Sequence, residues 1–389
     1  MHPPLHAMAQ ATRLTREGRL TEAVAAIQHA LRSAPTAEHD DGTVDAARDT
    51  AAADRADDRG ALARHPADIE DIPFRELPAD VEPSAASDRR EPAEQPSAPA
   101  DPAPGTFTSH RFAFGRHAYR YRLFVPGSPA ADRPVLVLLH GCKQDSEDFA
   151  RGTAMNELAR THGCIVVYPE QLRSANNMGC WNWFDPAHQR RGAGEPAMIA
   201  ALASKVAAEH GGDPRRIYVA GLSAGGAMAA LVARLYPEVF AAVGVHSGLP
   251  PAAAHDVASA LRVMRNGSRK ASAPAAYPPV PTIVFHGSAD KTVHPSNAEQ
   301  VVRESLDAWR QEGVTLDREQ ESIGGTERQA MRTRYVSRDG HVLLEKWDVA
   351  AGPHAWSGGE AGGSYTDPQG PSASRAMLEF FMAHRSRFA

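Results

Sequence analysis

Short apolar runs alternate with helical stretches over the C-terminal part of the chain. A wholly apolar run of four to eight residues is typical of a strand that is buried on both faces of a parallel sheet. Four such runs follow Pro134, and a fifth candidate lies between the third and fourth of them: 135–139, 165–168, 217–220, 283–285 and, as the fifth, 241–245. Their alternation with helical segments predicts an α/β fold with an open, doubly wound and mostly parallel sheet.

The ends of this region carry other patterns. Apolar and polar residues alternate from 107 to 125 around Gly115, which predicts an antiparallel hairpin where the domain begins. Residues 335–347 predict a further strand pair that turns at Asp339 and Gly340. A last helix is expected over 372–384. We therefore expect one α/β domain over residues 106–389.

The first 105 residues have a different composition and a different pattern of apolar residues. Residues 1–34 predict a helical hairpin broken at Gly18, because apolar side chains recur there at helical spacing: Leu20, Ala23, Ile27 and Leu31. The pattern resembles one tetratricopeptide unit, but a single unit cannot bury its apolar face alone, so a docking helix or partner-binding tail is the better interpretation. Residues 35–105 are rich in Ala, Asp, Pro, Arg and Glu and contain Phe74 as their only aromatic. This composition predicts a disordered acidic linker.

Composition narrows the possible partners. The 389 residues carry 42 Lys and Arg against 47 Asp and Glu, a formal net charge of -5, without the basic block that would bind nucleic acid. No apolar run approaches the roughly 20 residues of a transmembrane helix. The N-terminal residues lack the pattern of a secretory signal, so we expect a cytoplasmic protein. Three cysteines are too few for a disulfide scaffold, although one pair could bridge.

A candidate nucleophile follows the apolar run at 217–220. The sequence Gly221-Leu222-Ser223-Ala224-Gly225 comes next, and helix-forming residues follow it. A strand, a Gly-x-Ser-x-Gly turn and a helix together form the layout that exposes a nucleophilic serine above a sheet. The bare motif also occurs by chance in glycine-rich loops. Here the required context is present on both sides, which identifies Ser223 as the nucleophile.

An oxyanion hole needs two amide donors. One normally belongs to the residue after the nucleophile and the other to a loop after an earlier strand. The run 135–139 leads into His140-Gly141-Cys142, so we assign the donors to the backbone amides of Ala224 and Cys142. A role for Cys142 as a small buried residue is compatible with this assignment.

The acid and the base are expected downstream of the serine, because the triad order in this fold is Ser, acid, His. Asp290 follows the predicted strand 282–285 and is our candidate acid, with a turn-stabilising aspartate as the alternative. Histidines 286, 294, 341 and 354 are the candidate bases. His354 fits best, since it lies in a loop after the last strand, next to Gly352 and Pro353. No His, Cys and carboxylate cluster has metal-ligand spacing, and the triad itself requires no cofactor.

Several segments together resemble the polyhydroxybutyrate (PHB) depolymerase family of esterases over residues 106–388. They are LHGCKQD, VVYPEQ, CWNWF, GLSAGGAMA, VFHGSADKTV, GPHAWSGG and SYTDPQGPSAS. The resemblance implies an α/β-hydrolase fold, a triad of Ser223, Asp290 and His354, an oxyanion loop at Cys142, and a disulfide between Cys142 and Cys180. It also implies hydrolysis of polyhydroxybutyrate, short-chain polyhydroxyalkanoate or their oligomers. The family's secreted polymer-degrading members carry a signal peptide and a substrate-binding domain, which are not evident here, so soluble oligomers or short-chain esters are the expected substrates.

Three tryptophans flank the predicted site in sequence: Trp181, Trp183 and Trp356. Stacked indoles could form an apolar wall for an acyl chain, and core packing is the nearly equal alternative.

Two other functions stay open. The first is a feruloyl or acetyl-xylan type carbohydrate esterase, since that related group shares the triad layout. The second is a granule-surface binding protein with an inactive hydrolase domain, docking through the N-terminal helices.

Overall fold

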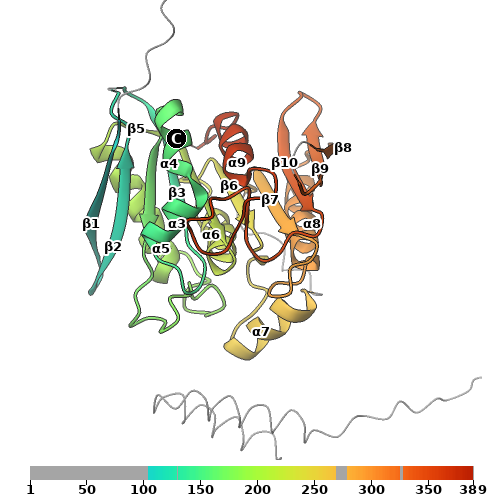
Figure 1. Ribbon diagram of the computed structural model, residues 1–389, viewed down its shortest axis with the longest axis horizontal. Helices are drawn as coiled ribbons and strands as arrows, with labels where there is room; N and C mark the ends of the chain where they lie inside the picture. Colours follow the sequence, from blue (N-terminus) through green and yellow to red (C-terminus); the bar gives the residue numbers. More distant parts are fainter. Residues whose placement is uncertain (1–103, 129, 269–277, 325–326, 389) are drawn as a thin grey trace, which may run out of the picture. The chain divides into compact units, whose positions relative to one another are not determined.

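The computed structural model describes residues 104–128, 130–268, 278–324 and 327–388 (Figure 1). The predicted helical segment 1–34 and the predicted linker up to residue 103 lie outside the described residues.

A mixed ten-stranded sheet forms the centre of the described chain, in the order β1-β2-β4-β3-β5-β6-β7-β10-β9-β8. The six strands from β4 to β10 in this order are parallel to their neighbours, and antiparallel pairs flank them on both sides. The strands are β1 Thr106–Phe114, β2 His117–Val125, β3 Arg133–Leu139, β4 Ile165–Pro169, β5 Gly212–Leu222, β6 Ala242–His246, β7 Thr282–Gly287, β8 Leu316–Ile323, β9 Ala330–Ser337 and β10 Val342–Val349. The prediction of a mostly parallel α/β sheet is confirmed.

Helices cover both faces of this sheet. On β3, Val135, Val137 and Leu139 belong to one hydrophobic cluster, whereas Leu136 and Leu138 belong to the other. The first cluster includes residues of α5 Gly194–Glu209, α6 Ala224–Leu235, α7 Val257–Asn266 and α8 Ser296–Gln311. The second includes residues of α3 Ser146–Thr153, α4 Met155–His162 and α9 Ala373–Met382. Burial on both faces explains why the central strands are apolar throughout rather than alternating.

The edge strands show where the sequence pattern was less informative. The predicted hairpin 107–125 is formed by β1 and β2, and the predicted pair in 335–347 by β9 and β10. The strand β8 was not predicted, because its sequence LDREQESI is mostly exposed at the sheet edge and carries charges where a half-buried strand would alternate. The last helix begins at Ala373 and ends at Met382, within the predicted range 372–384.

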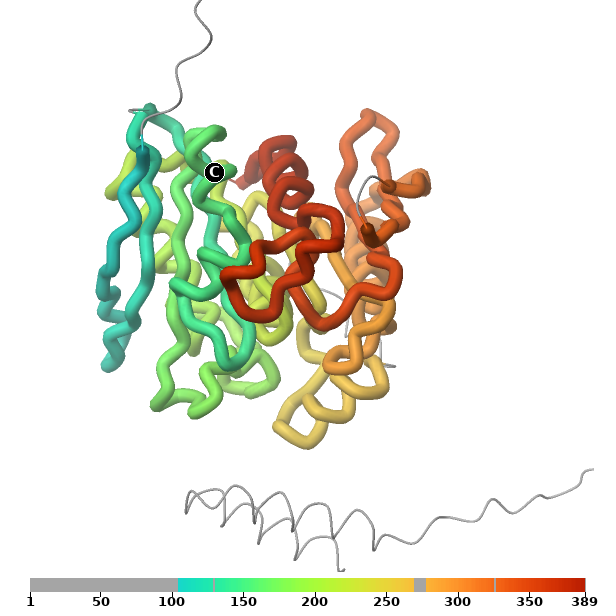
Figure 2. Tube along the Cα trace, viewed as in Figure 1, coloured from blue at the N-terminus to red at the C-terminus, as the bar shows by residue number. Residues whose placement is uncertain are grey.

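Two features of the chain outside the main sheet concern the site. The segment after β10 runs across to α3, as the red tube in Figure 2 shows, and there the amide of Glu360 donates to the carbonyl of Gly152 at 2.9 Å. This segment contains two short paired strands, β11 Trp356–Ser357 and β12 Thr366–Asp367. Separately, no helix of the described residues is both long and apolar enough to span a bilayer.

Candidate active site

Ser223 occupies a sharp turn between β5 and α6. Its backbone has φ 58° and ψ -119°, a conformation that non-glycine residues rarely adopt, and its amide donates to the carbonyl of His246 at 2.9 Å. A Cβ on Gly225 would lie 2.1 Å from the carbonyl oxygen of Leu139, and one on Gly221 would lie 2.4 Å from the carbonyl carbon of Gly225. Both glycines of the motif are therefore required by close backbone packing around the serine.

Two backbone amides near Ser223 are free to donate. Ala224 is the first residue of α6, and the amides in the first turn of a helix have no acceptor within the helix. In the loop after β3, the amides of Gly141, Lys143 and Gln144 all donate to protein acceptors. The amide of Cys142 between them donates to no group of the described residues. The two amides assigned from the sequence thus have no acceptor among the described residues, and the N-terminal end of α6 adds a favourable dipole for an anion.

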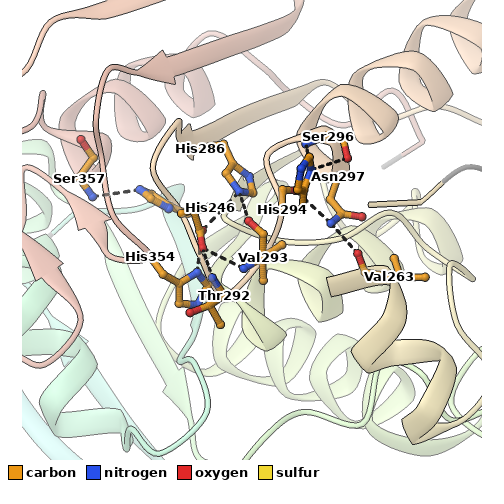
Figure 3. A network of polar contacts seen from close by, with 11 residues as sticks. His246, Val263, His286, Thr292, Val293, His294, Ser296, Asn297, His354 and Ser357 are labelled. Atoms are coloured by element: carbon orange, nitrogen blue, oxygen red, sulfur yellow. Dashed lines mark hydrogen bonds and ion pairs between the residues drawn. The ribbon is translucent and has the colours of Figure 1, made fainter. Parts of the chain in front are cut away.

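Asp290 lies in the loop after β7 and is buried. Its Oδ1 accepts the amides of Thr292 at 2.9 Å and Val293 at 2.8 Å, while its Oδ2 lies 2.7 Å from Nδ1 of His354 and 3.3 Å from Nε2 of His286. Figure 3 shows these four partners close together. Burial alone would raise the pKa of Asp290, but the hydrogen bonds from His286 and His354 hold it far below its usual value. The carboxylate is therefore ionised at neutral pH.

His354 follows β10, and its loop packs against the loop that carries Asp290. The amide of Ala289 donates to the carbonyl of Gly352 at 3.0 Å, and a Cβ on Gly287 would lie 2.2 Å from that same oxygen. Because a carboxylate only accepts, the contact with Asp290 places the proton of the neutral ring on Nδ1 and leaves a lone pair on Nε2. The imidazole of His354 can therefore act as a base through Nε2.

The structure joins His354 to Asp290 directly but does not join Ser223 to His354. No hydrogen bond of the described residues links the Ser223 hydroxyl to the imidazole. The serine is connected to the pair through its neighbouring strand, because its amide donates to His246 at the end of β6, and β6 lies between β5 and β7. All three side chains follow the carboxyl ends of parallel strands, so they lie at one edge of the sheet.

His246 is a site residue that the sequence reasoning missed. Its ring is buried between Trp356 and Phe285, with ring centroids 5.0 and 5.7 Å away, and its Nε2 accepts the amide of Ser357 at 3.0 Å. Burial, followed by the nearby His286 and His354, lowers the pKa of His246 to about 3. The ring is therefore neutral. Its place directly after the predicted apolar run 241–245 was the signal that could have found it.

The other candidate histidines lie outside the reacting groups. His286 is buried, and its Nε2 donates to the carbonyl of Val293 at 2.8 Å. The Nδ1 of His294 lies 2.8 Å from Oγ of Ser296, on the far side of this network from His354 in Figure 3. His341 precedes β10 and thus lies at the opposite edge of the sheet.

A disulfide joins the loop after β3 to the segment CWNWF. It links Cys142 to Cys180, 38 residues apart, and next to it the amide of Lys143 donates to the carbonyl of Met178 at 2.8 Å. Cys164 is buried as a free thiol, and burial raises its pKa to about 12. The candidate oxyanion loop is therefore tied covalently to the following segment.

The three tryptophans lie in the core. Trp181 and Trp356 are fully buried, and their indole N–H groups donate to the carbonyl of His140 at 3.1 Å and to Oγ of Ser374 at 2.9 Å. Trp183 is also buried and packs edge-on against Phe184. These contacts favour core packing over the alternative of an indole wall facing the substrate. Burial of this kind depends on neighbours that are distant in sequence.

The described residues hold no group of three or more His, Cys, Asp or Glu side chains arranged to bind a metal ion.

Comparison with known proteins gives a family match and several related esterases. The model of the family described as esterase PHB depolymerase matches residues 119–320. Poly(3-hydroxyalkanoate) depolymerase C from Paucimonas lemoignei is 33% identical over 256 residues, which are 62% of this chain and 60% of that protein. Feruloyl esterase B from Neurospora crassa is 29% identical over 280 residues, which are 67% of this chain and 87% of that protein.

Among solved structures, an acetyl xylan esterase from Aspergillus awamori has a TM-score of 0.56 at 19% identity. The match covers 71% of this chain and 99% of that one, and it shows the same fold.

Proposed function

The chain belongs to the esterase PHB depolymerase family, and from this premise we propose that it hydrolyses carboxylic esters through Ser223, His354 and Asp290. The hydrogen bond between His354 Nδ1 and Asp290 Oδ2, at 2.7 Å, carries the proposal. It fixes the tautomer in which Nε2 can take a proton, and the strained turn at Ser223 presents the hydroxyl at the same edge of the sheet.

The reaction proceeds in two halves. Nε2 of His354 takes the hydroxyl proton while Oγ of Ser223 attacks the ester carbonyl carbon, and the imidazolium then returns this proton to the departing alcohol. A water molecule next attacks the acyl-enzyme with His354 again as base, and the acid is released as the Ser223 hydroxyl re-forms. Asp290 stays ionised and stabilises the imidazolium. The amides of Cys142 and Ala224 stabilise the oxyanion, and each such donor is worth about 3 kcal/mol.

For the substrate we propose polyhydroxybutyrate, short-chain polyhydroxyalkanoate or soluble oligomers of 3-hydroxybutyrate. The family match and the similarity to the depolymerase of Paucimonas lemoignei support this choice. The chain spans 60% of that relative's length.

A feruloyl or acetyl-xylan type esterase is the second candidate function. The similarity to feruloyl esterase B favours it, because the match covers 87% of that protein. Both candidates use the same reacting groups, and they differ in the acid and the alcohol that are released.

The test compares products. Release of 3-hydroxybutyrate from soluble oligomers and from amorphous granules is measured beside release of ferulate from methyl ferulate and of acetate from acetylated xylan. p-Nitrophenyl butyrate serves as the general ester, and Ser223→Ala as the blank. Hydroxybutyrate release that is lost in Ser223→Ala supports the first function. Ferulate or acetate release without hydroxybutyrate release would replace it with the second, and an inactive wild type on every ester would overturn both.

A further inference from the structure

The buried side-chain amide of Gln144 makes hydrogen bonds at both of its ends. It lies at the end of the loop after β3 and is only 3% exposed. Its Oε1 accepts the amide of Gly141 at 2.9 Å, while its Nε2 donates to the carbonyl of Ser364 at 2.9 Å and to Oδ2 of Asp148 at 3.1 Å. A buried amide with both ends bonded is fixed in position, because breaking either bond would leave an unpaired polar group.

The hydrogen bond between Gln144 and the Gly141 amide constrains the backbone next to the amide of Cys142. Gln144 Oε1 takes the Gly141 amide, the carbonyl of Met178 takes the Lys143 amide, and the Gly141 carbonyl takes the amide of Gln144 itself at 3.3 Å. The chain between them turns through Lys143, which has φ 67°. The acceptors on either side thus constrain the peptide planes around Cys142, whose own amide has no acceptor among the described residues.

The Nε2 end of the Gln144 side chain donates to the segment that follows His354. Ser364 donates its amide to Oδ1 of Asp148 at 2.9 Å and its hydroxyl to Oδ2 of the same carboxylate. Burial alone would raise the pKa of Asp148, but the hydrogen bonds from Ser364 and Gln144 lower it. In addition, Trp356 donates its amide to the carbonyl of Tyr365 at 2.7 Å. Gln144 therefore connects the Cys142 loop to the segment that begins two residues after the proposed base.

We propose that Gln144 is a positioning residue. It orients the Cys142 amide toward the oxyanion, and it holds the loop that contains Cys142 against the segment that follows His354. This inference rests on the proposed function, because an oxyanion forms only if an ester is attacked. A positioning role of this kind acts on the transition state, so its loss lowers kcat and leaves KM nearly unchanged.

The test uses Gln144→Met, which has a similar length but neither hydrogen-bonding end. Gln300→Met is the matched control, since Gln300 is also buried but bonds to Arg303 and Glu304 on its own helix α8. Both variants are assayed on p-nitrophenyl butyrate and on the thionoester with C=S in place of C=O. Sulfur accepts hydrogen bonds weakly. An amide that donates to the oxyanion therefore accelerates the reaction of the oxygen ester more than that of the thionoester.

We expect Gln144→Met to lower kcat for the oxygen ester by about tenfold to a thousandfold, and the thionoester rate much less. Gln300→Met should keep the wild-type ratio of the two rates. An equal fall for both esters would show a purely structural role and overturn the proposal, as would unchanged kcat. If Gln144→Met does not fold, Gln144→Lys keeps a donor for Asp148 and Ser364 but loses the acceptor for Gly141, and an unaltered ester-to-thionoester ratio in it overturns the proposal.

The assays distinguish a failure of this inference alone from a failure of the proposed function. Wild-type turnover that disappears in Ser223→Ala establishes the hydrolase before any Gln144 variant is compared. Absence of that turnover would defeat the proposed function and this inference together.

Discussion

Nδ1 of His354 lies 2.7 Å from Oδ2 of Asp290, although 64 positions separate the two residues in the chain. The contact follows from the topology, because β7 and β10 are parallel neighbours and their loops leave the same edge of the sheet. The close approach of Gly287 to Gly352 brings the two loops into contact. A hydrogen bond between two such loops is the kind of relationship on which a proton-accepting histidine depends.

Replacing Asp290 tests this relationship. Asp290→Asn keeps the shape but offers an N–H or a neutral oxygen to His354, so the imidazole loses both its fixed tautomer and the charge that stabilises the imidazolium. We expect kcat for p-nitrophenyl butyrate to fall by about 10⁴ with little change in the circular dichroism spectrum. A fall of less than about tenfold would contradict the role of Asp290.

The disulfide between Cys142 and Cys180 predicts the number of free thiols. Denatured, unreduced protein should show one reactive thiol, that of Cys164, and Cys164→Ala should show none. Reduction should also lower kcat in wild type and in Cys164→Ala alike, because the loop that carries the Cys142 amide loses its covalent link. Finding three thiols before reduction would refute the bond.

Acid should destabilise the protein through His246. The folded pKa is lowered to about 3 from 6.5, so between these pH values the unfolded chain binds the proton and the folded chain does not. Stability therefore falls as pH falls through this window, by up to about 1.4 kcal/mol per pH unit for one such group. Urea unfolding at several pH values within it should give a shallower dependence for His246→Gln than for wild type. Parallel curves for the two proteins would rule out this contribution.

The buried position of Trp356 predicts an effect on stability rather than on chain-length preference. Trp356→Phe removes the hydrogen bond to Ser374 and should lower the free energy of unfolding by about 1–3 kcal/mol. The ratio of KM values for p-nitrophenyl butyrate and acetate should stay as in wild type. Ser374→Ala is the control, since it deletes this bond, together with the one from Ser374 Oγ to the carbonyl of Thr153, without altering the ring. A rise in KM for butyrate alone would restore the alternative of an indole wall against the substrate.

The sequence was most informative where burial is uniform. Strands such as β3 and β5 are covered on both faces, so their apolar runs could be recognised directly, and the strand, turn and helix around Ser223 followed from them. The charged edge strand β8 could not be recognised, because its partners rather than its own side chains make it a strand.

The candidate site could likewise be predicted only in part from the sequence. Asp290 and His354 could be proposed from chain order and loop position. The place of His246 in the site depends instead on its stack with Trp356 and Phe285, and the three residues come from three different strands. The burial of the tryptophans likewise depends on packing between distant segments. From the residues alone the pairing of the cysteines was open, and only the family resemblance indicated Cys142 with Cys180.

The central claim is that Ser223 is an activated nucleophile, and covalent labelling tests it most directly. The native protein is treated with a fluorophosphonate probe, digested and mapped by mass spectrometry, with Ser223→Ala and heat-denatured protein as controls. We expect one phosphonyl group per chain, on the peptide that contains Ser223, and none in either control. Absence of label from the native protein, or label on another residue that persists in Ser223→Ala, would contradict the account.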